Sequence, residues 1–146
     1  MSRYQQGRYT PEQPHKYAGN VKEIVYRSSW ELKVMIRLDR DPAVVYWNSE
    51  GLAIPYRSPL DEKIHRYFPD FIFKVKSRDG SMKTWICEVK PHAQTQLRTQ
   101  KRNTRKFLSE VATYAVNQAK WKAAEEFCKD QGWFFQVLTE KGEKFV

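Results

Sequence analysis

The chain has 146 residues, of which 26 are Lys or Arg and 17 are Asp or Glu, so its formal net charge is +9 at pH 7. This length fits one domain with one core. No apolar run approaches the roughly 20 residues of a membrane span, and the first residues lack the apolar segment of a secretory signal. The charge favours a polyanionic partner, most often nucleic acid, over a basic protein without one. Cys87 and Cys128 match neither a CxxC pair nor a zinc spacing, which predicts reduced core thiols.

Residues 1–22 are polar and rich in Tyr, Gln, Pro and basic residues. They predict an extended basic N-terminal arm, followed by a single domain over residues 23–146. Its basic side chains, interleaved with tyrosines, suit phosphate contacts combined with stacking. The alternative is a tail that is disordered or docks on a partner, and the composition does not separate the two.

The stretch SSWELKVMIRLDRDP predicts a helix that ends at Pro42. Ser28 followed by Glu31 fits a capping box at its start. Short strands follow: AVVYWNS and LAIPYR, separated by a turn at Glu50-Gly51. Next, IHRYFPDFIFKVK and MKTWICEVK predict a hairpin that bends at Asp79-Gly80.

Residues 91–103 are polar and basic and predict a mobile loop. The following stretch, TRKFLSEVATYAVNQAKWKAAEEFCKDQ, predicts a long helix capped by Gly132, and WFFQVLT predicts a final strand. The inner stripe predicted for this helix is Phe107, Val111, Tyr114 or Ala115, Gln118 or Ala119, Ala123 and Phe127. A strand–helix–strand crossover at the end implies an α/β fold with mixed pairing and with helices packed on the sheet.

Three charged residues stand in predicted strands that look partly buried: Asp70, Glu88 and Lys90. Glu88 and Lys90 share one face because side chains alternate along a strand. A solvated face is the common explanation of such a pair, but the apolar residues that flank this one argue against it.

The hairpin turn decides whether Asp70 reaches Glu88. A two-residue turn would place Asp70 opposite Val89, on the other face. A three-residue turn over residues 78–80 would place Asp70 opposite Glu88, and Gly80 suits the left-handed position that such a loop needs. A bend at Pro69 is the other way to bring the two acids together.

Two clustered carboxylates repel each other and persist when a cation lies between them. Mg²⁺ is the natural candidate, bound by Asp70, Glu88 and the backbone carbonyl of Val89, with positions left for water and a phosphate oxygen. Lys90 would orient the attacking water or offset charge on the phosphorane. This set predicts hydrolysis of a phosphodiester.

Pro69-Asp70, seventeen residues and then Glu88-Val89-Lys90 resemble the PD-(D/E)xK nuclease signature. The resemblance spans residues 24–139 and implies a restriction-endonuclease-like αβββαβ core with a mixed central sheet flanked by helices. Within that family the chain is similar to the head completion nucleases of tailed phages, in PHKY, YRSSWELK, IPYRSP, HRYFPDF, EVKP and NQAKWKAA.

This second resemblance implies a Mg²⁺-dependent endonuclease, with Mn²⁺ as a substitute, that acts on packaged DNA ends during virion assembly. It places the protein in the host cytoplasm, with retention in the virion left open, and implies no membrane and no secretion. Portal, neck or other virion proteins are the partners expected for the N-terminal arm. The alternatives are a catalytically silent, DNA-end-binding neck protein, and a junction resolvase or transposon-end endonuclease.

Related nucleases often add a glutamate from the first helix to the metal site, and Glu31 is the matching position. The alternative is the helix cap with Ser28, and a carboxylate folded back to cap the helix is poorly placed to reach a metal. Gln118 and Lys120 resemble helix residues that assist catalysis in some branches. Gln118 falls in the predicted inner stripe and is a candidate catalytic residue, whereas Lys120 is interpreted as solvated.

No acidic residue occurs between Lys90 and Glu110. The basic residues in this gap are predicted to contact the DNA backbone, with two arginines of the earlier strands extending the track. The set is Arg57, Arg66, Arg98, Lys101, Arg102, Arg105 and Lys106. Six neutralised phosphates would give a log–log salt slope of about −5 and weak sequence specificity. The alternative is a solvated basic face.

Overall fold

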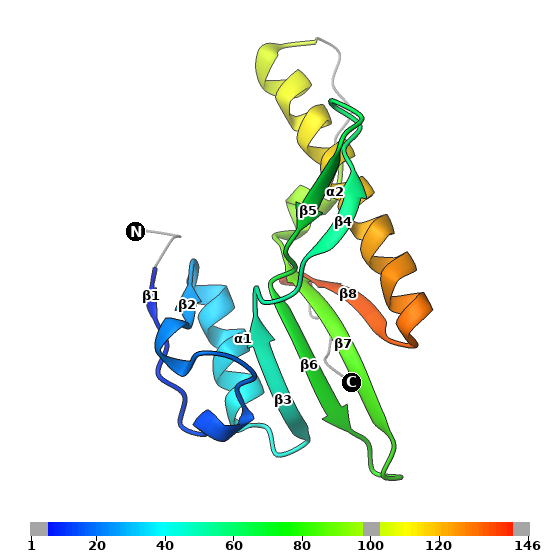
Figure 1. Ribbon diagram of the computed structural model, residues 1–146. Helices are drawn as coiled ribbons and strands as arrows, with labels where there is room; N and C mark the ends of the chain where they lie inside the picture. Colours follow the sequence, from blue (N-terminus) through cyan, green and yellow to red (C-terminus); the bar gives the residue numbers. More distant parts are fainter. Residues whose placement is uncertain (1–5, 98–102, 142–146) are drawn as a thin grey trace.

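The computed structural model describes residues 6–97 and 103–141. Four strands form its central sheet in the order β3-β6-β7-β8 (Figure 1). They are β3 (Val44–Ser49), β6 (Phe71–Lys76), β7 (Met82–Val89) and β8 (Phe134–Leu138). The pairs β3–β6 and β6–β7 are antiparallel, whereas β7–β8 is parallel, so the predicted mixed sheet is confirmed.

Two long helices cover opposite faces of this sheet. Helix α1 (Ser29–Arg40) packs with Phe71, Phe73 and Cys87, while α2 (Arg105–Gln131) packs with Ile86 of β7. Neighbouring strand residues point to opposite faces, so each strand contributes to two cores. Both cysteines are buried free thiols, as predicted. None of the described helices has the length and apolar character needed to cross a bilayer.

The β6–β7 hairpin has the three-residue turn on which the site depends. The N–H of Ser77 donates to the Ser81 carbonyl at 2.8 Å, which leaves residues 78–80 as the loop. Gly80 has φ 87°, the left-handed conformation predicted for it. Phe71 pairs with Cys87, and the same register carried one residue further sets Asp70 opposite Glu88.

The prediction of one strand over residues 64–76 is wrong. Strand β5 (Ile64–Tyr67) ends before Pro69, which has no N–H for a ladder, and β6 begins at Phe71. Strand β5 pairs instead with β4 (Ile54–Arg57) in a separate two-stranded sheet. Figure 1 shows this β4–β5 hairpin and the first half of α2 projecting past the end of the central sheet.

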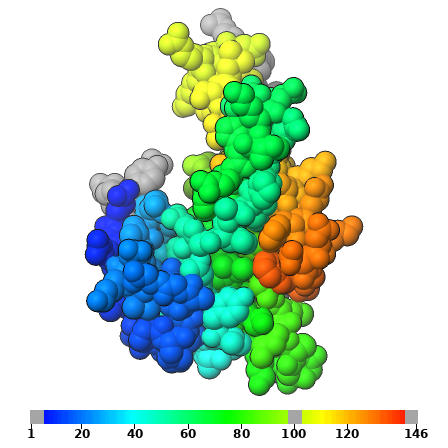
Figure 2. Space-filling view, in the orientation of Figure 1, coloured from blue at the N-terminus to red at the C-terminus, as the bar shows by residue number. Residues whose placement is uncertain are grey.

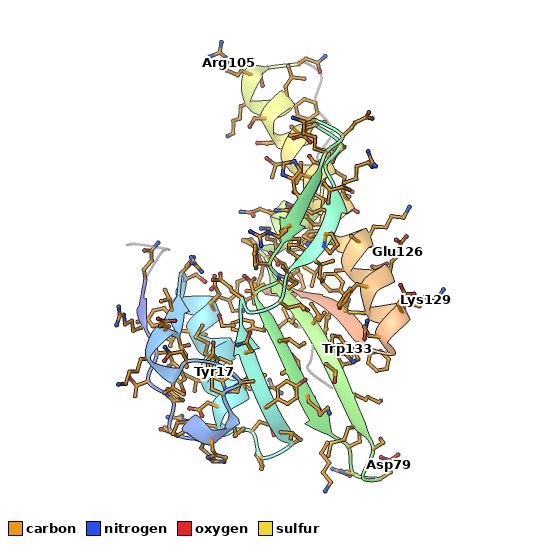
Figure 3. All side chains as sticks on the ribbon, in the orientation of Figure 1. Tyr17, Asp79, Arg105, Glu126, Lys129 and Trp133 are labelled. Atoms are coloured by element: carbon orange, nitrogen blue, oxygen red, sulfur yellow. The ribbon has the colours of Figure 1, made fainter. Side chains whose placement is uncertain are left out.

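Residues 6–22, within the predicted N-terminal arm, are not an extended segment. Strand β1 (Gly7–Arg8) pairs with β2 (Val25–Tyr26), and two short 3₁₀ helices, η1 (Pro14–Lys16) and η2 (Val21–Glu23), lie between them. The ring of Tyr17, which is labelled in Figure 3, lies 4.7 Å from the ring of Trp47 on β3.

The anchor of this segment is Lys16, which is only 6% exposed. Its ammonium group donates to the carbonyls of Asp39 and Asp41, each at 2.8 Å. These carbonyls lie at the C-terminal end of α1, where a helix leaves acceptors unpaired. Lys16 is therefore part of the folded body and is unavailable for the phosphate contact considered from the sequence.

Between β7 and α2, the predicted mobile loop contains a 3₁₀ helix, η3 (His92–Thr95). Of the inner stripe predicted for α2, Ala119, Ala123 and Phe127 pack against the core, but the buried residues of the helix are Asn117, Trp121, Ala124 and Cys128. The predicted stripe omits Trp121, whose indole ring belongs to this buried face. Gly132 caps α2 in the left-handed conformation, as predicted.

Candidate active site

One end of the central sheet gathers the charged residues selected from the sequence. Because β3–β6 and β6–β7 are antiparallel, β3 ends, β6 begins and β7 ends at this same end. Helix α1 also begins there (Figure 1). The sheet end therefore carries Glu31, Glu50, Asp70, Glu88 and Lys90 from separate parts of the chain.

Asp70 is held by hydrogen bonds on both its side chain and its backbone. Its Oδ2 accepts from the N–H of Val89 at 2.8 Å, and its carbonyl accepts from the N–H of Glu50 at 3.1 Å. Burial, together with the negative charge of Glu88, raises the pKa of Asp70 to about 8. A cation bound next to this carboxyl group would stabilise its ionised form, which burial and Glu88 otherwise disfavour.

Glu88 is a buried carboxylate, 8% exposed, with a different partner for each oxygen. The hydroxyl of Tyr67 donates to Oε1 at 2.6 Å. The Nζ of Lys90 lies 3.6 Å from Oε2. Burial, with the charge of Glu88 beside it, raises the pKa of Tyr67, so Tyr67 remains a donor. Oε2 is therefore the oxygen that faces the cationic side of the site.

Glu31 is at the start of α1 and makes a cap-type contact. Its N–H donates to the Oγ of Ser28 at 3.1 Å, which confirms Ser28 as the N-cap. Its own carboxylate accepts from the N–H of Arg27 at 3.4 Å, one residue before the position that a capping box uses. Burial raises the pKa of Glu31, and Glu50 and Glu88 add to the shift, so Glu31 lies within electrostatic reach of the site.

The donor set of this site fits a hard divalent cation. Asp70 and Glu88 supply carboxylate oxygens, the backbone of Val89 adjoins them, and such ions take oxygen ligands and retain waters. Over residues 6–97 and 103–141, however, no three His, Cys, Asp or Glu side chains are grouped closely enough to hold a metal. The side-chain ligands available to a cation at this site are therefore the two carboxylates of Asp70 and Glu88.

A family model described as "TnsA-like endonuclease N terminal" matches residues 41–140. The chain belongs to this endonuclease family. The matched range contains Asp70, Glu88 and Lys90, and with it the predicted PD-(D/E)xK resemblance is confirmed. A curated relative, the head completion nuclease of Enterobacteria phage T4, is 36% identical over 141 residues, which cover 93% of this chain and 91% of the relative. The restriction-endonuclease-like fold class is confirmed by this membership and by the mixed sheet.

Two residues on α2 lie opposite to where the sequence places them. Gln118 is exposed and lines a groove between α2 and β8 together with Glu125 and Val137, so the prediction that it faces inward is wrong. Lys120 is half-buried, with its Nζ 5.7 Å from the ring centre of Tyr67. Lys120, interpreted as solvated from the sequence, is therefore the one that reaches the partner of Glu88.

Three further residues near the site were not predicted from the sequence: Arg27, Glu50 and Tyr67. Arg27 pairs with Glu50 across the end of the sheet. Glu50 attracted notice only as part of a turn, because nothing in the sequence shows that its turn meets Asp70. The sequence position of Tyr67, three residues before Asp70, was the available indication that it lies near the site. Its contact with Glu88 depends on the break between β5 and β6 at Pro69, which was not predicted.

The predicted DNA-contact residues fall on the projecting part of this endonuclease. Arg57 is exposed and donates to the Glu62 carbonyl at 2.7 Å, while the guanidinium of Arg66 lies 5.6 Å from the ring centre of Phe68. Arg105 begins α2 at the far tip of the molecule (Figure 3), about 22 Å along the helix axis from Lys120. Lys106 follows it and is also exposed. The remaining predicted contacts, Arg98, Lys101 and Arg102, lie outside the described residues.

Proposed function

We propose that this chain is a Mg²⁺-dependent DNA endonuclease that acts during phage head completion. The observation that carries the proposal is the convergence of Asp70, Glu88 and Lys90 at one end of the sheet, in a chain of an endonuclease family. The role in head completion is supported by the 36% identical relative, which covers nearly the whole chain.

Asp70, Glu88 and the backbone carbonyl of Val89 are the proposed ligands of Mg²⁺, with Mn²⁺ as a substitute and Glu31 as a further acidic group. All-oxygen donors favour these hard cations over zinc. When bound, the cation polarises a phosphate and lowers the pKa of a coordinated water.

The chain's own residues prepare the two acids for this task. The N–H of Val89 fixes one oxygen of Asp70, and the hydroxyl of Tyr67 fixes one oxygen of Glu88. Lys90, 3.6 Å from the other Glu88 oxygen, orients the attacking water or offsets the charge that develops on the phosphate. Water adds to phosphorus, one P–O bond to deoxyribose breaks, and the products are a phosphomonoester and a hydroxyl group.

The DNA backbone is proposed to run along the basic residues of the β4–β5 hairpin and the start of α2. Between this projecting part and the N-terminal segment, the outline of the molecule is concave (Figure 2). Phosphate contacts carry little sequence information, so specificity arises from DNA structure. The contact residues are Arg57, Arg66, Arg98, Lys101, Arg102, Arg105 and Lys106. Cleavage is proposed to take place in the host cytoplasm, where the N-terminal segment binds a portal or neck protein.

The test is nicking of supercoiled plasmid with Mg²⁺ or Mn²⁺. The parent should cut, and Asp70→Ala, Glu88→Ala and Lys90→Ala should not. Lys76→Ala is the control, because Lys76 is an exposed residue at the end of β6 that lies away from the site. DNA binding without cleavage by the parent or by any of the variants would instead indicate a silent DNA-end-binding protein. Preferential cutting of branched DNA would indicate a junction resolvase.

A further inference from the structure

Arg27 and Glu50 form an ion pair beside the candidate active site. Arg27 precedes the N-cap of α1, Glu50 follows β3, and Nη1 of Arg27 contacts Oε1 of Glu50. The pair faces solvent, with 53% and 35% of the two side chains exposed. An ion pair this exposed contributes little to stability, so support of the fold does not explain why it occurs here.

The backbone of Glu50 is fixed next to Asp70. Its N–H donates to the Asp70 carbonyl at 3.1 Å, and its φ of 56° lies in the left-handed region that residues with side chains rarely adopt. Gly51 follows in a tight fit, since an added Cβ would meet Oδ1 of Asn48 at 2.0 Å. Conformations of this kind persist only where the surroundings enforce them, often at functional sites.

The guanidinium of Arg27 interacts electrostatically with acidic residues of the site as well as with Glu50. The hydrogen bond to Glu50 raises the pKa of Arg27, and the charges of Glu31 and Asp70 raise it further. A guanidinium offers paired N–H donors that match two oxygens of a phosphate. Arg27 is therefore an exposed phosphate-type donor, paired with a residue whose backbone is hydrogen-bonded to Asp70.

We propose that Arg27 binds a DNA backbone phosphate next to the one being cleaved, and that Glu50 occupies the Arg27 guanidinium until DNA arrives. The inference rests on the proposed function, because it assumes that DNA passes Asp70 and Glu88. Binding exchanges one anionic partner of Arg27 for another. Arg27 is thus a positioning residue, and Glu50 is its competitor for the phosphate.

The test is a double-mutant cycle on the affinity for a labelled DNA duplex, measured by fluorescence anisotropy in EDTA. Arg27→Ala should weaken binding by about tenfold and reduce the log–log salt slope by about 1. Glu50→Gln should strengthen binding by up to about fivefold, because it frees Arg27. This gain should disappear in the Arg27→Ala background, because coupled residues are not additive.

The Arg40–Glu12 ion pair is the matched control. It lies at the other end of α1, with a 3.0 Å contact and side chains 62% and 59% exposed. Glu12→Gln changes the net charge as Glu50→Gln does, and it should leave the affinity unchanged. An equal gain from Glu12→Gln, or a Glu50→Gln gain that persists without Arg27, would overturn the proposal.

The double-mutant binding cycle and the nicking assay test the two proposals independently. The cycle is run without metal, so it does not depend on cleavage. If the protein shows the coupling but never nicks plasmid, the contact of Arg27 with DNA is supported and the endonuclease activity is refuted. If the protein nicks plasmid but shows no coupling, the endonuclease activity is supported and the proposed role of Arg27 is refuted.

Discussion

The hydroxyl of Tyr67 donates to Oε1 of Glu88 at 2.6 Å, and both residues are buried. Tyr67 ends β5 and Glu88 is in β7, so this hydrogen bond joins the β4–β5 hairpin to the central sheet. It also assigns the two Glu88 oxygens different tasks, since Lys90 lies on the side of Oε2. The projecting β4–β5 hairpin therefore supplies a residue that orients one of the two proposed metal-binding carboxylates.

Tyr67→Phe should lower the free energy of unfolding by about 1–3 kcal/mol, because it leaves a buried carboxylate oxygen without its donor. Urea denaturation measures this change. Tyr56→Phe is the control, since Tyr56 is a buried tyrosine of β4 whose hydroxyl has no carboxylate partner among the described residues. Equal losses in the two variants would show that the Glu88 contact contributes nothing specific.

The stability of the metal-free protein should depend on the ionisation of Asp70. Its folded-state pKa of about 8 is above the ordinary value of 3.8. The stability that its protonation contributes is therefore fully present below pH 3.8 and is lost as the pH rises through 8. In EDTA, the melting temperature of the parent should fall between pH 5 and pH 9 more steeply than that of Asp70→Asn. Parallel curves for the two proteins would refute this assignment.

Lys16→Met should destabilise the protein by about 3 kcal/mol, because two helix-end carbonyls lose a charged donor. Chemical denaturation measures the change, and Lys22→Met is the control at an exposed lysine of the same segment. If both variants unfolded like the parent, the N-terminal segment would not be anchored as described.

Arg105→Ala combined with Lys106→Ala should reduce the log–log salt slope of DNA binding by about 2, which is about 0.9 per lost phosphate contact. The matched control is Lys76→Ala combined with Lys83→Ala. These lysines flank the hairpin turn at Asp79, at the opposite end of the molecule from Arg105 (Figure 3). A drop in slope with the control pair alone would place the DNA elsewhere.

The alignment of Asp70 with Glu88 was predictable because it depends on a local feature. The length of the hairpin turn sets which residues face each other, and Gly80 indicates a left-handed residue in a three-residue loop. The caps of the two long helices followed similarly from short-range patterns, with Ser28 before α1 and Gly132 after α2.

The features that the sequence did not predict depend on distant partners. Lys16 is buried because backbone carbonyls at the end of α1 accept its hydrogens, and carbonyls carry no sequence signature. The orientation of α2, which exposes Gln118 and brings Lys120 over Tyr67, is set by packing on the β4–β5 hairpin as well as on the sheet. That hairpin was itself hidden, because residues 64–76 show one continuous strand-like pattern.

The most direct test of the central claim is a crystal structure with Mn²⁺, in which anomalous scattering locates the ion. The account predicts one strong anomalous peak bound by carboxylate oxygens of both Asp70 and Glu88, on the side of Lys90. Crystals soaked in Mn²⁺ that show no peak there, or a peak bound by neither acid, would contradict it.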